Sequence, residues 1–278
     1  MGEESSPLVS RFDVKRIRDG QPERMVDTVA REEPLDIRVS YWFKEAVHAQ
    51  SLALTMRTPG NDRELTAGLL LSEGVIRSRE DLVDLRALGT EPSNEIVAEL
   101  ARQVDFDAWK WQRNSVLNSS CGVCGKRSRE AIARPDYLGE DTLTVDAALI
   151  DQLPSLLAER QKAFAKTGGL HAAALVNVNG EVEQVFEDIG RHNALDKLIG
   201  SCVLNSTLPL HNRLLFLSSR SSFELVQKTV MAGGVMLVTV GAPSSLAIET
   251  AREFRVTLIG FARERRFNIY SGDWRVNL

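Results

Sequence analysis

The chain has little cysteine, no long apolar run and no excess of basic residues. Three cysteines in 278 residues cannot form the dense disulfide framework of a small secreted domain, so we expect a reducing compartment. No apolar run approaches the roughly 18 residues that a membrane-spanning helix needs, and the polar, acidic first residues do not form a signal peptide. These absences predict a cytoplasmic protein without a membrane partner.

Basic residues are outnumbered by acidic ones, 34 against 38, which gives a formal net charge of -4. A general nucleic-acid binder needs a basic footprint that this chain lacks, so we expect no nucleic-acid partner. The length fits one large domain or two smaller ones, and it is sufficient for a core without disulfides or a structural metal. We expect two domains.

The front half of the sequence predicts mixed α/β structure. Alternating apolar and polar residues at 38–44 and 47–56 suit paired strands. A helix should follow, because Asn61 and Glu64 have the spacing of a capping box and Gly74 suits a helix C-terminus. Residues 94–100 predict a further strand, and residues 108–126 a loop.

The back half alternates between helical and strand patterns. A helix is expected at 145–166, then a strand pair at 171–178 and 181–186, with Asn179-Gly180 signalling a type I′ turn. Further helices are predicted at 193–200, 222–231 and 244–253, and further strands at 214–218, 235–240 and 256–261. This alternation favours a largely parallel sheet covered on both faces, an α/β fold. Turn-forming and charged residues at 135–142 predict a boundary between domains at 1–140 and 141–278.

Two cysteines, Cys121 and Cys124, lie in the glycine-flanked segment 118–126. Such flanks favour an exposed backbone where a thiolate can form, and Lys126 and Arg127 just downstream would stabilise it. Four interpretations are open: half of a zinc site, a dithiol redox centre, a sulfur-transfer centre carrying a persulfide, or two cysteines without a task. Exposed reactive thiols are readily oxidised, which disfavours the last.

Zinc and thioredoxin-like chemistry both lack supporting residues. A structural zinc site needs four ligands, whereas Cys202 is solitary and His171 and His192 are far apart in sequence. A thioredoxin-like pair normally follows a strand and opens a helix, and the segment before Cys121 does not have a strand pattern. We expect no metal.

Two further segments have candidate ligand-binding chemistry. Residues 260–267 place three arginines just beyond a predicted strand, at the end where α/β sheets bind ligands, and arginine matches phosphate geometry. Residues 187–197 gather polar groups at a strand-to-helix turn, where His192 suits either proton transfer or a capping and ion-pair role. His171 resembles the start of a zinc-deaminase His-x-Glu motif, but Ala173 replaces the glutamate, which argues against deamination.

Taken in order, these segments resemble the FdhD family of sulfur carrier proteins required for formate dehydrogenase activity. The resemblance covers almost the whole chain and rests on an ordered series of motifs: Glu32-Glu33-Pro34-Leu35, Met56-Arg57-Thr58-Pro59-Gly60-Asn61-Asp62, Leu70-Leu71-Ser72-Glu73-Gly74, Ser120-Cys121-Gly122-Val123-Cys124-Gly125, Thr167-Gly168-Gly169-Leu170-His171-Ala172-Ala173, residues 187–197 and Arg266-Phe267-Asn268-Ile269-Tyr270.

The resemblance implies a sulfurtransferase. It would accept sulfur from a cysteine desulfurase on Cys121 and pass it to the molybdenum cofactor, in its bis(molybdopterin guanine dinucleotide) form, for formate dehydrogenase. Cys124 would assist, either by attacking the persulfide to form a disulfide or by sharing the sulfur. The resemblance also implies a homodimer and, for the back half, a cytidine-deaminase-like three-layer αβα domain without zinc.

The family's cofactor-contacting segment matches six residues here: Phe261, Ala262, Arg263, Glu264, Arg265 and Arg266. Family members commonly have a glycine within this segment, whereas Glu264 and Arg265 occupy its middle here, and Ser219 also stands where a glycine is common. Two rival functions stay open: a non-catalytic chaperone that holds the cofactor, and a redox dithiol protein.

Overall fold

The computed structural model describes residues 8–89, 93–108, 111 and 143–278. The cysteine segment and the expected domain boundary at 135–142 lie outside these residues. The division into domains 1–140 and 141–278 therefore stays a prediction.

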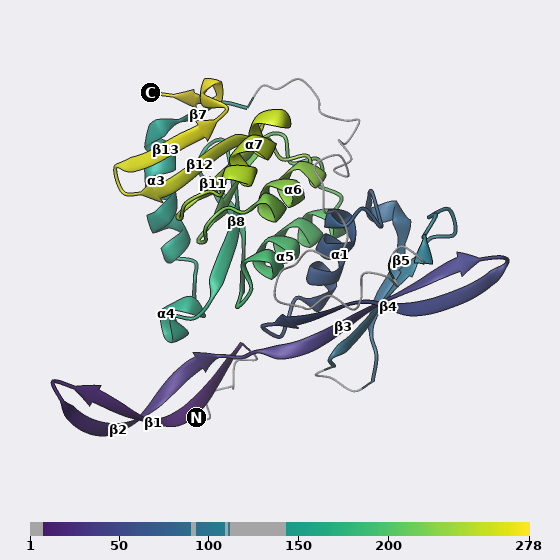
Figure 1. Ribbon diagram of the computed structural model, residues 1–278, viewed down its shortest axis with the longest axis horizontal. Helices are drawn as coiled ribbons and strands as arrows, with labels where there is room; N and C mark the ends of the chain where they lie inside the picture. Colours follow the sequence, from purple (N-terminus) through teal and green to yellow (C-terminus); the bar gives the residue numbers. More distant parts are fainter. Residues whose placement is uncertain (1–7, 90–92, 109–110, 112–142) are drawn as a thin grey trace.

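Two β-hairpins form a long ribbon at the N-terminal end of the chain. Strands β1 (Val9–Arg18) and β2 (Gln21–Ala30) pair antiparallel, and β3 (Glu33–Phe43) and β4 (Ala46–Arg57) pair in the same way. Figure 1 shows the hairpins pointing to opposite ends of the molecule. The strand pair predicted at 38–44 and 47–56 is confirmed, and the β1–β2 hairpin was not predicted.

The second hairpin belongs to a four-stranded sheet with the order β4-β3-β6-β5. Strand β6 (Glu95–Leu100) confirms the strand expected at 94–100, and it runs parallel to β3. Strand β5 (Leu82–Ala87), which follows the short helix η1 (Arg79–Asp81), completes the sheet.

Helix α1 (Asp62–Ser72) packs beside this sheet, and the capping box predicted at its N-terminus does not form. Asn61 has a left-handed backbone with φ 58° and its side chain makes no cap hydrogen bond, so it cannot act as expected. The predicted end is correct, because Gly74 has φ 71° just beyond the last helical turn.

The back half forms a six-stranded sheet with the order β13-β12-β11-β10-β8-β9. Its strands are β8 (His171–Asn177), β9 (Val182–Asp188), β10 (Arg213–Leu217), β11 (Met236–Thr239), β12 (Thr257–Arg263) and β13 (Arg266–Ser271). Only β10, β11 and β12 run parallel to one another, whereas β8, β9 and β13 join through antiparallel pairings. The expectation of a largely parallel sheet was therefore wrong, because two hairpins flank a short parallel centre.

The hairpin between β8 and β9 does not contain the predicted type I′ turn. That turn needs positive φ at both central residues, but only Gly180 has it, with φ 84°, and Asn179 does not. The Gly180 N–H donates to the Asn177 carbonyl at 3.0 Å, and the Asn177 N–H donates to the Glu181 carbonyl. The connection is thus a longer turn that ends in a left-handed glycine.

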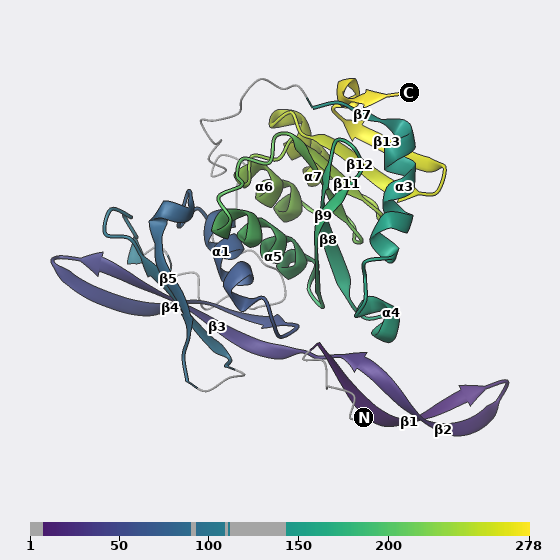
Figure 2. The same cartoon turned by 180° about the vertical axis from the view of Figure 1, so that it is seen from behind.

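Helices cover both faces of this sheet (Figure 2). Helices α5 (Arg191–Leu204), α6 (Phe223–Met231) and α7 (Ser245–Glu253) contribute to one buried apolar cluster, together with α1. Helix α3 (Ala147–Ala158) packs on the opposite face. The chain ends in η3 (Asp273–Arg275) and β14 (Val276–Asn277), which pairs with β7 (Val145–Asp146).

One expected helix, 145–166, divides into β7, α3 and the short helix α4 (Phe164–Thr167). The break has a tertiary cause. Glu187, on β9, accepts hydrogen bonds from the N–H groups of Ala163 and Phe164 at 2.9 and 2.7 Å. Its carboxylate thus satisfies free N–H groups at the N-terminus of α4, so α4 forms as a separate helix.

The two halves are joined by a close crossing of α1 and α5. A Cβ added at Gly68 would lie 1.9 Å from the Asp196 carbonyl oxygen, and one at Gly200 would lie 1.7 Å from the Glu64 carbonyl oxygen. Glycine at both positions lets the backbones touch. The apolar cluster on this side includes residues of both halves, such as Leu70 and Leu195.

Candidate functional site

The parallel strands β10, β11 and β12 end at one edge of the six-stranded sheet, called here the carboxyl edge. Open α/β sheets bind ligands at such an edge. The antiparallel strands bring two more groups to it: His171 at the start of β8, and Asp188 at the end of β9. The Ser218 Oγ ties β10 to β8 by accepting the Ala172 N–H at 2.8 Å.

Three helices begin at the carboxyl edge, each directly after a strand. Gly190, Ser222 and Ser244 are the N-caps of α5, α6 and α7. Ser244 accepts the Ala247 N–H at 3.2 Å and caps its own helix, whereas Ser222 makes no such bond. Helix N-termini present N–H donors and positive partial charge, so this edge suits an anionic group.

Two histidines at the edge are held in their neutral form. Burial, reinforced by Lys228, Arg191 and His171, lowers the pKa of His192 to about 3. Burial and Arg191 also lower the pKa of His171, although Asp188 opposes them. Because His192 is neutral, the 3.9 Å approach of its Nε2 to Glu224 is not an ion pair. The same nitrogen contacts Ser222 Oγ at 3.4 Å.

The predicted arginine segment is the turn of the β12–β13 hairpin, and it extends from the same edge. The Phe261 N–H donates to the Gly241 carbonyl, in the loop after β11, at 3.0 Å. Ala262 is fully buried, so its side chain faces the core. The other four residues of the segment are exposed in the turn: Arg263, Glu264, Arg265 and Arg266.

The middle of this turn has a strained backbone. Arg265 has φ 59°, a left-handed conformation that a glycine adopts without steric cost. Glu264, its neighbour, accepts a hydrogen bond from Ser155 Oγ on α3 at 3.4 Å. The three exposed arginines therefore occupy a turn whose shape is set by backbone strain and by a contact with α3.

Behind the edge, a buried polar cluster called here the junction joins the two halves of the chain. It consists of Asp188, Lys197, Asn193 and Thr58. Fully buried Asp188 pairs with Lys197 Nζ at 2.7 Å and accepts the Thr58 N–H at 3.1 Å. Its other oxygen accepts from the Gly190 N–H and from Asn193, so the junction also orients the first turn of α5.

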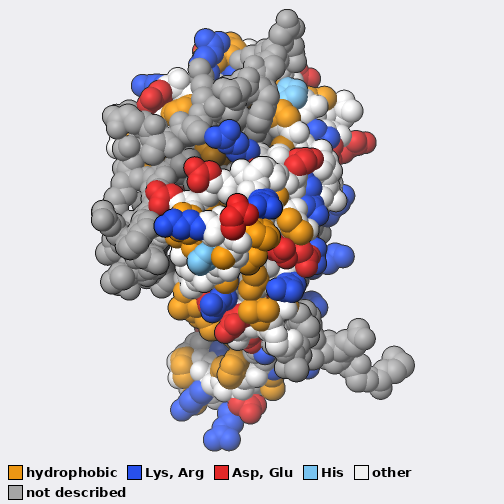
Figure 3. Space-filling view, turned by 90° about the vertical axis from the view of Figure 1, so that its right-hand side faces the viewer, with side chains coloured by type: hydrophobic (Ala, Val, Ile, Leu, Met, Phe, Trp, Pro, Cys, Tyr) orange, Lys and Arg blue, Asp and Glu red, His pale blue; other side chains and the backbone are white. Residues whose placement is uncertain are grey.

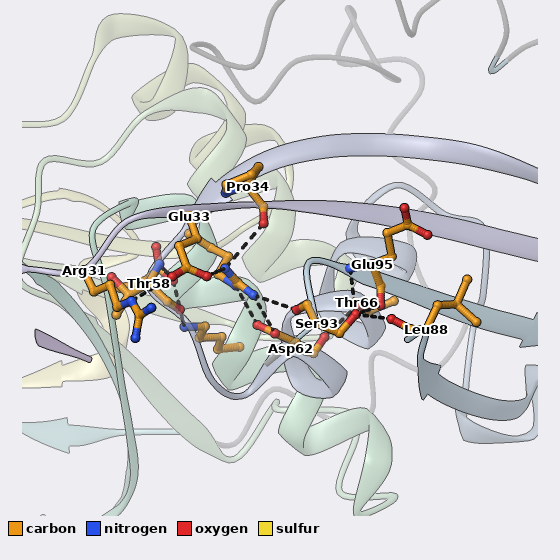
Figure 4. A network of polar contacts seen from close by, with 12 residues as sticks. Arg31, Glu33, Pro34, Thr58, Asp62, Thr66, Leu88, Ser93 and Glu95 are labelled. Carbon is orange, nitrogen blue, oxygen red and sulfur yellow. Dashed lines mark hydrogen bonds and ion pairs between the residues drawn. The ribbon is translucent and has the colours of Figure 1, made fainter. Parts of the chain in front are cut away.

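A second buried cation holds the entry to α1. Arg57 is 1% exposed and donates from Nε and Nη2 to the two oxygens of Asp62, both at 3.0 Å. It also donates to the carbonyls of Pro34 and Ser93. Figure 4 shows Pro34, Asp62 and Ser93 close together, with dashed lines to their shared partner. An open groove of about 650 Å³ lies beside this cluster, between the start of α1 and the β5–β6 hairpin.

The structure describes some of the site residues predicted from the sequence and not others. The arginine segment and His192 both lie at the carboxyl edge but in different parts of it, since the first follows β12 and the second follows β9, with His171 on the adjacent strand β8. Cys121 and Cys124 lie outside the described residues, so their geometry stays a prediction. Cys202 is buried in α5 and burial raises the pKa of its thiol, which makes it unreactive.

Sequence reasoning missed Ser222 and Thr58 as members of these clusters, whereas Lys197 lies within the polar segment 187–197 that it singled out. Ser222 had a detectable signal, since a serine at the first position of a predicted helix suggests an N-cap at a strand end. Thr58 had none, because it meets Asp188 from 130 positions away in the chain.

Within the described residues, no group of three or more His, Cys, Asp or Glu could hold a metal ion. Because Cys121 and Cys124 lie outside that part, the expectation of no metal stays a prediction. No helix in the described ranges is long and apolar enough to cross a membrane.

Comparison with known proteins gives consistent matches. The model of the FdhD/NarQ family matches residues 30–277. A curated relative from Streptomyces coelicolor, Sulfur carrier protein FdhD, is 42% identical over 98% of this chain and 96% of its own length. Relatives of the same name are 44% identical in Corynebacterium efficiens (89% of this chain, 90% of its own) and 40% identical in Saccharolobus solfataricus (96% and 98%).

A solved structure shares the fold. The crystal structure of a protein from Desulfotalea psychrophila, described as a formate dehydrogenase accessory protein, aligns with a TM-score of 0.73 over 98% of this chain and 100% of its own. At 22% sequence identity, this likeness shows the fold alone.

Proposed function

The chain belongs to the FdhD/NarQ family, and from that premise we propose that it carries sulfur for the maturation of a formate dehydrogenase. One observation carries the proposal: several curated sulfur carriers are 40% or more identical over nearly the full length of both chains. Cys121 and Cys124 supply the sulfur chemistry that such a carrier needs.

We infer that Cys121 holds the sulfur as a persulfide. Its thiolate attacks the outer sulfur of a persulfide on a cysteine desulfurase; a bond to Cys121 Sγ forms as the bond to the donor's Sγ breaks, and the donor leaves as a thiolate. The exchange needs no added oxidant. Two release routes stay open: direct transfer of the outer sulfur, or attack by Cys124 that frees sulfide and leaves a Cys121–Cys124 disulfide for a thiol to reduce.

We propose the molybdenum cofactor, as bis(molybdopterin guanine dinucleotide), as the sulfur acceptor, held at the carboxyl edge. The N-termini of α5, α6 and α7 and the exposed arginines 263, 265 and 266 form a donor set that suits phosphate groups. Neutral His192 and His171 can exchange hydrogen bonds with an uncharged base or pterin edge without adding charge. Phe261 already donates its N–H to the Gly241 carbonyl and Ala262 is buried, so the exposed arginines of the segment carry the proposed contacts.

The sulfur-carrier role is tested by intact-mass spectrometry under non-reducing conditions. We expect the protein incubated with a cysteine desulfurase and L-cysteine to gain one sulfur atom that a reductant removes. The Cys121→Ala variant should show no gain, and Cys202→Ala, which removes a cysteine buried in α5, should behave as the unmodified protein does. A gain that persists in Cys121→Ala would contradict the assignment of the carrier residue.

The rival chaperone function predicts a different result. A protein that only holds the cofactor would bind a guanine nucleotide at the carboxyl edge, with affinity unchanged in Cys121→Ala, and would gain no sulfur from the desulfurase. Nucleotide binding and sulfur gain measured on the same preparation therefore separate the two functions. The predicted homodimer is tested alongside by analytical ultracentrifugation.

A further inference from the structure

The tip of the β3–β4 hairpin exposes large apolar side chains. Trp42, Phe43 and Val47 are 39%, 50% and 58% exposed, and Trp42 and Val47 face each other across the two strands. We call these three residues the hairpin tip. Figure 1 shows it projecting beyond the body of the molecule, and Figure 3 shows hydrophobic side chains gathered on the side toward which it points. Exposed apolar groups of this kind mark interaction sites.

A series of aromatic rings connects the hairpin tip to Trp111. The Phe43 ring lies 5.9 Å from the ring of His48, which stacks on Tyr41 at 5.8 Å. Tyr41 contacts Phe106 at 4.7 Å, and Phe106 stacks on Trp111 at 6.4 Å. Tyr41, Phe106 and Trp111 are buried, so the series is anchored in the core at one end and exposed at the other.

Trp111 is the last described residue before the cysteine segment, and Cys121 follows it by ten positions in the sequence. Ten residues of fully extended chain span at most about 35 Å, at about 3.5 Å per residue. Trp111 therefore ties the core beneath the hairpin tip to the chain that carries Cys121.

The hairpin tip has the composition of a protein-binding surface. Tryptophan and arginine dominate the residues that carry binding energy at interfaces, and aromatic groups are enriched there. Arg102 lies over the Trp42 ring at 4.8 Å and pairs with Glu45 at 2.6 Å, and Lys44 lies over the Phe43 ring. Two half-exposed aromatic side chains with cations beside their rings suit a folded partner that has an apolar pocket.

The arrangement points to one occupant: we propose that the hairpin tip docks the persulfide-bearing protein that supplies sulfur to Cys121. The proposal rests on the function proposed above. The sulfur donor is favoured over the cofactor as the occupant because the β12–β13 turn, whose arginines are proposed to bind the cofactor, lies at the other end of the molecule in Figures 1 and 2. A donor on the tip leaves the carboxyl edge free for the cofactor.

The test compares two ways of loading Cys121. In one, a cysteine desulfurase with L-cysteine is the donor; in the other, inorganic polysulfide donates its terminal sulfur to the Cys121 thiolate and leaves one sulfur shorter. The double variant Trp42→Ala/Phe43→Ala removes the hairpin tip. The matched control, Phe12→Ala/Ile17→Ala, removes two side chains that are 56% and 61% exposed on the β1–β2 hairpin. Circular dichroism and thermal unfolding verify that each variant is folded.

We expect the tip variant to lose at least tenfold in loading rate at low desulfurase concentration and to recover at high concentration, as a raised KM requires. Loading of the tip variant by polysulfide, and loading of the control variant by either donor, should match the unmodified protein.

Equal desulfurase loading in the tip variant would overturn the docking proposal and leave the carrier function intact. Absence of loading from either donor in the unmodified protein would instead overturn the carrier function. A tip variant that only changes the oligomeric state, with normal loading, would assign the tip to a second copy and refute the proposal.

Discussion

The carboxyl edge and the hairpin tip are surfaces of opposite kinds. Behind the edge, polar groups bind one another: Asp188 accepts from four groups on two halves of the chain. At the tip, Trp42, Phe43 and Val47 are partly open to solvent, and their exposed apolar area would gain a partner only on association. A prearranged polar edge suits a small charged ligand, whereas exposed aromatic side chains suit a protein partner. The comparison predicts that stability depends on the junction and partner recognition on the tip.

The largest expected effect comes from breaking the junction. Lys197→Met leaves the Asp188 carboxylate buried without its cation, and removing one partner of a buried pair costs about 3–5 kcal/mol of unfolding free energy. Urea denaturation measures this loss. The control Lys162→Met, at an exposed position, should change stability by less than about 0.5 kcal/mol, as should Phe43→Ala at the tip.

A double-mutant cycle separates the pair from other effects. If the Asp188–Lys197 contact carries the loss, adding Asp188→Asn to Lys197→Met should recover part of it, because the uncompensated charge is gone. Losses that simply add would mean that the two residues act independently, and would contradict the role given to the junction.

The next effect concerns how closely the halves approach. Gly68→Ala places a methyl group 1.9 Å from the Asp196 carbonyl oxygen, so α1 and α5 must separate, at a cost of about 3 kcal/mol. Gly169→Ala is the control, because a Cβ there meets no atom closer than 3.7 Å. Thermal and urea unfolding of both variants measure the difference, and equal stabilities would show that the crossing can relax.

These junction contacts mark the limit of prediction from one sequence. Helices and strands in the back half were predictable because each has its own apolar period and turn residues. The divided helix at 145–166 was not, since its break depends on Glu187, and neither was the pairing of Thr58 with Asp188, 130 positions apart. Contacts between distant segments have no local pattern.

The candidate site was predictable in part for the same reason. The arginine segment was found because its charges follow a strand pattern. Its place in a hairpin turn was not, because that turn lacks glycine: Arg265 takes the left-handed position that a glycine would normally mark. The cytidine-deaminase-like description of the back half stays a prediction, as do the roles of Cys121 and Cys124.

A smaller effect is expected from pH, and its main source is His192 at the carboxyl edge. The pKa of His192 is about 3 in the folded protein and about 6.5 when unfolded. Protons therefore bind the unfolded state first as pH falls below 6.5, and stability decreases between pH 6.5 and pH 3, by about 1 kcal/mol from pH 6 to pH 5. His171 acts in the same direction, and Asp196, whose pKa burial raises, acts against it. In His192→Gln this slope should be shallower in urea denaturation at each pH; an unchanged slope would assign it to other groups.

The smallest effect separates charge from backbone shape in the arginine turn. Arg265→Gly relieves a left-handed residue, a gain of about 1–2 kcal/mol that glycine's greater unfolded-state entropy reduces to roughly 0.5–1 kcal/mol. Arg265→Ser removes the same charge without that relief.

If Arg265 contacts phosphate, both variants should weaken GDP binding several-fold. The loss should be smaller at high salt, because screening already reduces the contribution of an exposed charge. If neither variant weakens binding, Arg265 does not contact phosphate. Arg263 lies in β12 without a positive φ, so Arg263→Gly should destabilise the protein, and this contrast shows that relief of strain belongs to position 265.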